Sequence, residues 1–167
     1  SMAKIRDMSV INTPPRERLP VETYVMEFNQ EILKMGIENE LARNGQVFFL
    51  YNRIKTIYEM AKYLEQVVPQ ARVVVAHGQM DPEELEDIIH DFIEYKYDIL
   101  LTTTIIESGI DIPRANTIFI DRADRFGLAQ LYQLRGRVGR SNLKAYAYLF
   151  YEGKRAVSED AMKKLRV

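Results

Sequence analysis

Two arginines in the last third of the sequence are the residues whose type and spacing most clearly suggest chemistry. They are Arg137 and Arg140, in the segment QLRGRVGR that begins at Gln133. On a helix, residues three apart project to the same side. Arginine stays charged and makes forked hydrogen bonds to phosphate oxygens, so the pair could stabilise charge on a phosphoryl group in transfer. Ordinary surface arginines on a helix are the alternative interpretation.

A run of hydroxyl side chains followed by a carboxylate forms a second candidate site. It is the segment TTTIIESGIDIP, from Thr102 to Pro113. Hydroxyls at the end of a buried strand can donate to phosphate oxygens, and Asp111, after a glycine turn, can accept from ribose hydroxyls. Helix capping and turn formation would explain each feature alone. Together with the arginine pair, the segment indicates a nucleotide site.

The elements that must position these residues alternate between strand and helix. This order predicts an α/β fold of three layers, a mainly parallel sheet with helices on both faces. Ligands of such sheets lie beyond the carboxyl ends of the strands, where polar loops occur at 52–53, 77–79, 102–113 and 121–127. Apolar patterning predicts strands over 21–28, 46–51, 72–76, 98–103, 117–121 and 145–151, and helices over 30–43, 54–68, 82–92, 128–135 and 158–166.

Composition and charge are those of one globular domain. The chain has 167 residues, of which 47% are apolar and 28% charged. It has no cysteine and no apolar run long enough to cross a bilayer, so we expect a cytoplasmic protein without disulfides. The acidic stretch 81–98 carries a net charge of -7 and fits the solvated face of a helix. The basic stretch 122–144 carries +5, which suits phosphates.

Several kinds of active site are absent from the sequence. A nucleoside triphosphatase normally needs the phosphate-cradling loop G-x-x-x-x-G-K-[ST] and a pair of acids after a strand to hold magnesium, and the sequence contains neither. We therefore expect that this chain does not hydrolyse ATP by itself. Two histidines without cysteine argue against a zinc site, and no Ser-His-acid set stands out, so no metal site is predicted.

The motifs resemble the second RecA-like domain of superfamily 2 helicases and translocases. The likeness extends over about 21–151, with TTTIIESGIDIP similar to motif V and QLYQLRGRVGR similar to motif VI. Within that superfamily, the TPP-R linker and the segments FFLYNR, VAHGQM and ADRFGLAQ most resemble the family of bacterial transcription-repair coupling factors (Mfd). The RecG fork-reversal helicases are the nearest alternative family.

The resemblance implies a role in nucleotide binding for the motif V and VI residues. Arg137 and Arg140 match the arginine fingers that reach ATP on the preceding RecA-like domain. Gly109 and Asp111 match positions that line the nucleotide cleft, with Asp111 near the ribose. Gln133 matches the glutamine of motif VI. ATP and its Mg²⁺ would be held mainly by a first RecA-like domain, which carries the motifs missing here.

The resemblance also implies contacts with the nucleic-acid backbone. Thr103 matches a threonine of motif V that contacts this backbone. Arg53 and the loop that contains His77 and Gly78 resemble other backbone-facing positions. For His77 a packed loop histidine is the alternative, and for Arg53 a solvent-exposed residue at a helix start.

A domain plan and a set of partners follow from the same resemblance. Residues 1–20 are expected to form an extended linker, with Ser1 and Met2 set aside as a cloning remnant, 21–153 the second RecA-like domain, and 154–167 the truncated start of a helical region after motif VI. The implied partners are the first RecA-like domain of the same chain, double-stranded DNA and, through other domains, RNA polymerase and nucleotide-excision repair proteins. The implied function is half of an ATP-dependent DNA translocase in transcription-coupled repair. A RecG-like domain and a non-catalytic RecA-like binding module are the alternatives.

Overall fold

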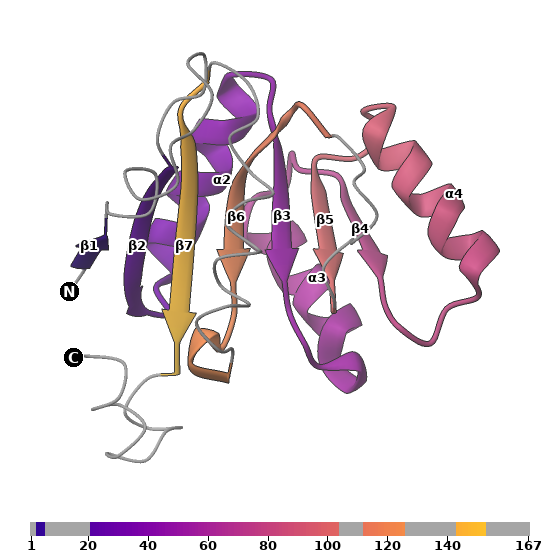
Figure 1. The fold of residues 1–167 in the computed structure, drawn as a ribbon, viewed down its shortest axis with the longest axis horizontal. Helices are drawn as coiled ribbons and strands as arrows, with labels where there is room; N and C mark the ends of the chain where they lie inside the picture. Colours follow the sequence, from indigo (N-terminus) through magenta and orange to yellow (C-terminus); the bar gives the residue numbers. More distant parts are fainter. Residues whose placement is uncertain (1–2, 6–20, 104–111, 126–142, 153–167) are drawn as a thin grey trace.

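The structure is a computed structural model, and it describes residues 3–5, 21–103, 112–125 and 143–152 (Figure 1). The strands in this part of the chain are β1 (Ala3–Ile5), β2 (Val21–Glu27), β3 (Gln46–Leu50), β4 (Val73–Ala76), β5 (Ile99–Thr102), β6 (Ala115–Ile120) and β7 (Ala145–Tyr151). The helices are α2 (Gln30–Ala42), α3 (Ile57–Val67) and α4 (Pro82–Ile93), with short 3-10 helices η1 (Ile54–Thr56) and η2 (Ala123–Arg125).

The strands form one sheet in the order β1-β2-β7-β6-β3-β5-β4. Every neighbouring pair runs parallel except β1 and β2, which run antiparallel. Strand β1 lies in the range expected to be an extended linker and covers part of the outer edge of β2. The predicted α/β fold with a mainly parallel sheet is confirmed, and the carboxyl ends of six strands therefore lie at one edge of the sheet.

Helices cover both faces of the sheet, as predicted. Side chains alternate along β3, so that Val47 and Phe49 join one core while Phe48 and Leu50 face the other side. Helices α2 and α3 pack on the first face, behind the sheet in Figure 1. Helix α4 packs on the second face through Phe92. Both faces of the central strands are buried, which explains their continuously apolar sequences.

Helix α2 follows the sequence pattern closely. Asn29 caps it, because its side-chain oxygen accepts a hydrogen bond from the Ile32 amide at 3.0 Å. Leu33 and Ile37, which are four residues apart and so lie on one side of the helix, are fully buried. The helix ends at Ala42, one residue earlier than predicted. This helix brings its last turn over the amino ends of the strands.

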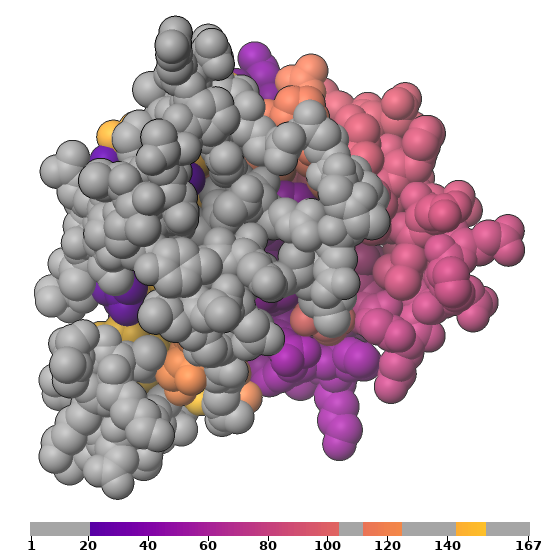
Figure 2. All heavy atoms as spheres, viewed as in Figure 1, coloured from indigo at the N-terminus to yellow at the C-terminus, as the bar shows by residue number. Residues whose placement is uncertain are grey.

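Helix α4 explains most of the acidic stretch of the sequence. It begins at Pro82 as predicted, and Asp81 occupies the N-cap position without making a side-chain capping hydrogen bond. Its acidic residues Glu83, Glu84, Glu86 and Asp87 are exposed, and the helix projects at one side of the molecule (right in Figures 1 and 2). Asp98 is the exception, since it is buried and paired with Arg72.

The remaining differences from the predicted elements are small. The helix predicted over 54–68 starts with the 3-10 turn η1 before α3. Strand β6 begins two residues earlier than predicted, at Ala115. The helices predicted over 128–135 and 158–166 lie outside the described residues. Within the described ranges, no helix is both long enough and apolar enough to cross a membrane.

Candidate nucleic-acid interface

Four loops begin at the carboxyl edge of the sheet. Strands β6, β3, β5 and β4 are neighbours in that order and run parallel, so the residues that follow them lie in a row. Backbone hydrogen bonds continue across their ends, from the Tyr51 amide to the Thr102 carbonyl at 2.8 Å and from the Thr103 amide to the Ala76 carbonyl at 3.2 Å. The Asp121 amide likewise donates to the Leu50 carbonyl at 2.9 Å. The fold therefore fixes the starts of these loops relative to one another.

Thr103 and Gly78, both predicted to face nucleic acid, are brought together by the fold. Thr103 is buried, and its hydroxyl oxygen accepts a hydrogen bond from the Gly78 amide at 3.2 Å. Gly78 is exposed, and a Cβ placed on it would have no atom within 4 Å. The threonine thus holds the loop after β4 against the end of β5. Its own contact with nucleic acid stays a prediction.

His77 is held by two contacts at the start of the same loop. Its Nδ1 accepts a hydrogen bond from the Gln79 amide at 3.2 Å. Its ring also meets Tyr58, with the centroids 5.8 Å apart and the planes at 87°. These contacts fit the packed loop histidine that the sequence left open, while contact of His77 with nucleic acid stays a prediction. Tyr58, an exposed aromatic residue beside this loop, was missed because its helical spacing gave no signal.

Arg53 is partnered within the protein. Its Nη2 lies 2.6 Å from Oδ2 of Asp121, and its guanidinium carbon lies 4.5 Å from the centroid of the Tyr51 ring. The backbone of Arg53 precedes η1, which agrees with the helix-start alternative. Its partner Asp121 is not among the site residues predicted from the sequence. The available signal was its position directly after the buried strand β6.

The charged groups around Asp121 alternate in sign. Burial raises the pKa of Asp121, and the Arg53 and Arg122 guanidiniums counteract part of that rise. Arg122 has a left-handed backbone, with φ of 54°, and its Nη2 lies 2.8 Å from Oε2 of Glu152. The Glu152 hydrogen bond is the largest cause of the raised pKa of Arg122. Two ion pairs therefore stand side by side after β3, β6 and β7.

The five residues assigned to nucleotide binding lie outside the described residues. They are Gly109, Asp111, Gln133, Arg137 and Arg140. Their roles therefore stay predictions. The described residues contain no group of three or more His, Cys, Asp or Glu side chains that could hold a metal ion.

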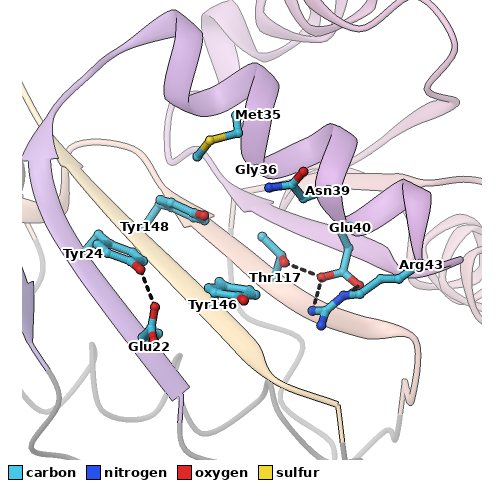
Figure 3. Close-up of a pocket in the computed structure, with 10 residues that line it drawn as sticks. All are labelled: Glu22, Tyr24, Met35, Gly36, Asn39, Glu40, Arg43, Thr117, Tyr146 and Tyr148. Carbon is cyan, nitrogen blue, oxygen red and sulfur yellow. Dashed lines mark hydrogen bonds and ion pairs between the residues drawn. The ribbon is translucent and has the colours of Figure 1, made fainter.

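A cavity of about 410 Å³ opens at the opposite edge of the sheet, between α2 and strands β2, β7 and β6 (Figure 3). The rings of Tyr24, Tyr148 and Tyr146 form its floor and stack in a row. At one end, Thr117 and Arg43 hydrogen bond to the carboxylate of Glu40. This cavity lies at the amino ends of the strands, away from Arg53, His77, Gly78 and Thr103 at the carboxyl edge.

Relatives of the chain fall among DNA-repair and helicase proteins. Transcription-repair-coupling factors of Staphylococcus epidermidis and Staphylococcus aureus are 52% identical to it over 166 residues, which is 99% of this chain. The chain spans only 14% of the length of these relatives. A solved structure of RecG bound to a three-way DNA junction is 41% identical with a TM-score of 0.74, covering 91% of this chain and 20% of RecG.

A more distant likeness concerns the fold alone. The C-terminal domain of Saccharomyces cerevisiae Dbp5, in a complex with Gle1, is 22% identical with a TM-score of 0.59 and covers 84% of this chain and 82% of that one. The sheet order and the helices on both faces thus form the RecA-like fold of helicase C-terminal domains. The family model for the helicase conserved C-terminal domain matches residues 26–142, which is more than half of the chain. The chain therefore belongs to the helicase conserved C-terminal domain family.

Proposed function

We propose that this chain is the second RecA-like half of an ATP-dependent double-stranded DNA translocase that acts in transcription-coupled repair. The observation that carries the proposal is the row of loops at the carboxyl edge, where Arg53, Thr103 and Gly78 follow neighbouring parallel strands. Ligands of such sheets bind at this edge. Identity of 52% with transcription-repair-coupling factors over nearly the whole chain supports the biological role.

In this proposal ATP lies between two RecA-like domains. The first domain holds most of the nucleotide and its Mg²⁺, while Gly109, Asp111 and Gln133 of this chain line the facing wall. Arg137 and Arg140 reach the γ-phosphate and stabilise the charge that develops on it during transfer. Loss of the γ-phosphate releases that contact. Repeated closing and opening of the two domains then moves the protein along DNA.

The DNA contacts in this proposal are made to phosphates. Thr103, Gly78, His77 and Arg53 face the backbone rather than the bases. Such contacts carry no sequence information, and affinity falls as salt rises because bound counterions are released. Binding is therefore independent of sequence and sensitive to salt. RNA polymerase and nucleotide-excision repair proteins bind other parts of the full-length protein.

The arginine-finger assignment is tested with Arg140→Ala in the full-length protein. We expect DNA-dependent ATPase activity to fall by about 10³-fold or more, the range that such arginines supply in related phosphoryl transfer. Arg114→Ala is the matched control, since Arg114 is an exposed arginine before β6 at the opposite edge of the sheet. Retention of full activity by Arg140→Ala would contradict the assignment.

A RecG-like fork-reversal domain is the second candidate. The RecG structure bound to a three-way junction supports it, although at 41% identity it is less similar than the coupling factors. Comparing the ATPase stimulated by linear duplex DNA with that stimulated by a three-way junction separates the two. A coupling-factor motor responds to both, whereas a fork-reversal enzyme responds mainly to the junction. A non-catalytic binding module would show no stimulation by either DNA.

A further inference from the structure

The side chain of Arg53 is fixed at two points. Its guanidinium stacks on the ring of Tyr51, and Nη2 donates to the carboxylate of Asp121 at 2.6 Å. The Tyr51 ring is itself held, because its hydroxyl lies 2.6 Å from Oγ1 of Thr56. The Asp121 carboxylate extends from the end of β6, whose backbone is anchored to β3. Both supports of the guanidinium are therefore parts of the rigid sheet and its first helical turn.

The ion pair between Arg53 and Asp121 points its positive end outward. The side chain of Arg53 is 38% exposed, whereas that of Asp121 is 12% exposed. The neighbouring ion pair is oriented in the same way, because the side chain of Arg122 is 26% exposed and that of Glu152 is 15% exposed. Each pair is neutral as a whole, but its guanidinium faces solvent and its carboxylate lies beneath. An anion that approaches this edge meets the cationic groups first.

Arg53 retains donors that its internal partners do not use. A guanidinium carries five N–H donors. Asp121 takes one at Nη2, and Nε is buried, so the donors left for a ligand are those on the two Nη nitrogens that Asp121 does not use. Arginine pairs readily with phosphate because its planar donors match phosphate oxygens. A long side chain that is already fixed also loses less rotamer freedom when it binds.

We propose that Asp121 is a positioning residue, which holds the guanidinium of Arg53 ready for a phosphate of the nucleic-acid backbone. This inference rests on the proposed function and adds to it a residue without a direct contact to DNA. The carboxylate acts through Arg53 alone, so its effect vanishes when Arg53 is absent. Loss of the carboxylate should therefore weaken the affinity for DNA and leave the rate of ATP hydrolysis at saturating DNA unchanged.

The test is a double-mutant cycle in the full-length protein with Asp121→Ala, Arg53→Ala and the two together. The measurement is ATPase rate against the concentration of linear duplex DNA, which separates half-saturation from the maximal rate. We expect Asp121→Ala to raise the half-saturating DNA concentration by about three- to tenfold at an unchanged maximal rate. Arg53→Ala should raise it at least as much, and the double variant no further than Arg53→Ala.

Asp98→Ala is the matched control for a general loss of stability. Asp98 is also a buried carboxylate paired with an exposed arginine, Arg72, with 3.0 Å between Oδ2 and Nε, but the pair lies at the amino edge of the sheet. It accepts the Arg72 backbone amide as well, so its removal disturbs the fold at least as much. We expect Asp98→Ala to leave the half-saturating DNA concentration unchanged. If Asp121→Ala does not fold, Asp121→Asn keeps the size of the side chain and replaces it in the cycle.

Four results would overturn the inference. Tighter DNA binding by Asp121→Ala would mean that the carboxylate restrains Arg53 rather than presenting it. An unchanged half-saturation, or additive effects in the double variant, would mean that the two residues do not act together. If Arg53→Ala has no effect while Arg140→Ala abolishes activity, the inference fails and the proposed function stands. A wild-type protein without any DNA-dependent ATPase activity would instead refute the proposed function.

Discussion

The carboxylate of Glu40 is the polar group whose removal should harm the fold most. It lies near the end of α2, and its side chain has no exposed surface. Three donors reach it: the Thr117 hydroxyl from β6, and Nε and Nη2 of Arg43 at 3.1 and 2.7 Å. The carboxylate therefore joins the last turn of the helix to the middle of the sheet (Figure 3).

Glu40→Ala should lower the free energy of unfolding by about 3 kcal/mol. Removing one partner of a buried ion pair costs about 3–5 kcal/mol, and an unpaired buried hydroxyl such as that of Thr117 costs about 1–3 kcal/mol. The side chain of Arg43 is 26% exposed and can turn to water, which places the total near the lower end of the range. The free energy of unfolding falls by about 2 kcal/mol per M of urea, so the midpoint of urea unfolding should decrease by roughly 1.5 M.

The assay is urea unfolding of this 167-residue chain, with Glu38→Ala as the control. Glu38 is on the same helix and makes no side-chain hydrogen bond or ion pair within the described residues, so its removal should change stability by less than about 0.5 kcal/mol. Thr117→Val, made alone and together with Glu40→Ala, reports on the buried bond, and the two losses should be less than additive. A midpoint shift for Glu40→Ala no larger than that of Glu38→Ala would refute the reasoning.

Two further outcomes follow from the same region. A Cβ on Gly45 would lie 1.6 Å from Oε2 of Glu40, so Gly45→Ala should lower the free energy of unfolding by about 2 kcal/mol. Urea unfolding measures this change, and a decrease below about 0.5 kcal/mol would contradict the tight contact. Burial raises the pKa of Tyr148 from 10.0 to about 12, so the unfolded chain loses this proton first as pH rises through that interval. The free energy of unfolding should therefore fall between pH 10 and about 12, and it should fall less steeply with pH in the Tyr148→Phe variant. Tyr58→Phe is the control, and an equal dependence of the unfolding free energy on pH in the two variants would contradict the prediction.

Most of the fold could be predicted from the sequence because the core strands carry a strong local signal. The segment VFFLY, residues 47–51, is apolar throughout, as a strand covered on both faces requires, and its first four residues lie in β3. The spacing of Leu33 and Ile37 fixed the buried side of α2 in the same way. The 3-10 start of α3 was missed because its residues continue the apolar period of the helix, so the pattern does not distinguish the two.

The site was less accessible to sequence reasoning than the fold. Thr103 and Gly78 could be placed at one edge from strand order alone, and the structure joins them by a hydrogen bond. The pairing of Arg53 with Asp121 could not be predicted, because 68 residues separate them and nothing local specifies that β3 and β6 are neighbours. Motif spacing identifies residue types at the ends of strands, whereas partner choice depends on the order of strands in the sheet.

The place of β7 in the sheet has a consequence for biosynthesis. This strand is the last described element of the chain, yet it joins β2 on one side to β6 on the other. Val21 pairs with Ala145, about 120 residues later, so a ribosome must release nearly all of the domain before β2 gains a parallel neighbour. Contacts so distant in sequence form slowly, and incomplete chains expose unpaired strand edges. A nascent polypeptide that stalls before Ala145 would hold two separate sheet fragments and would be a natural target for chaperones.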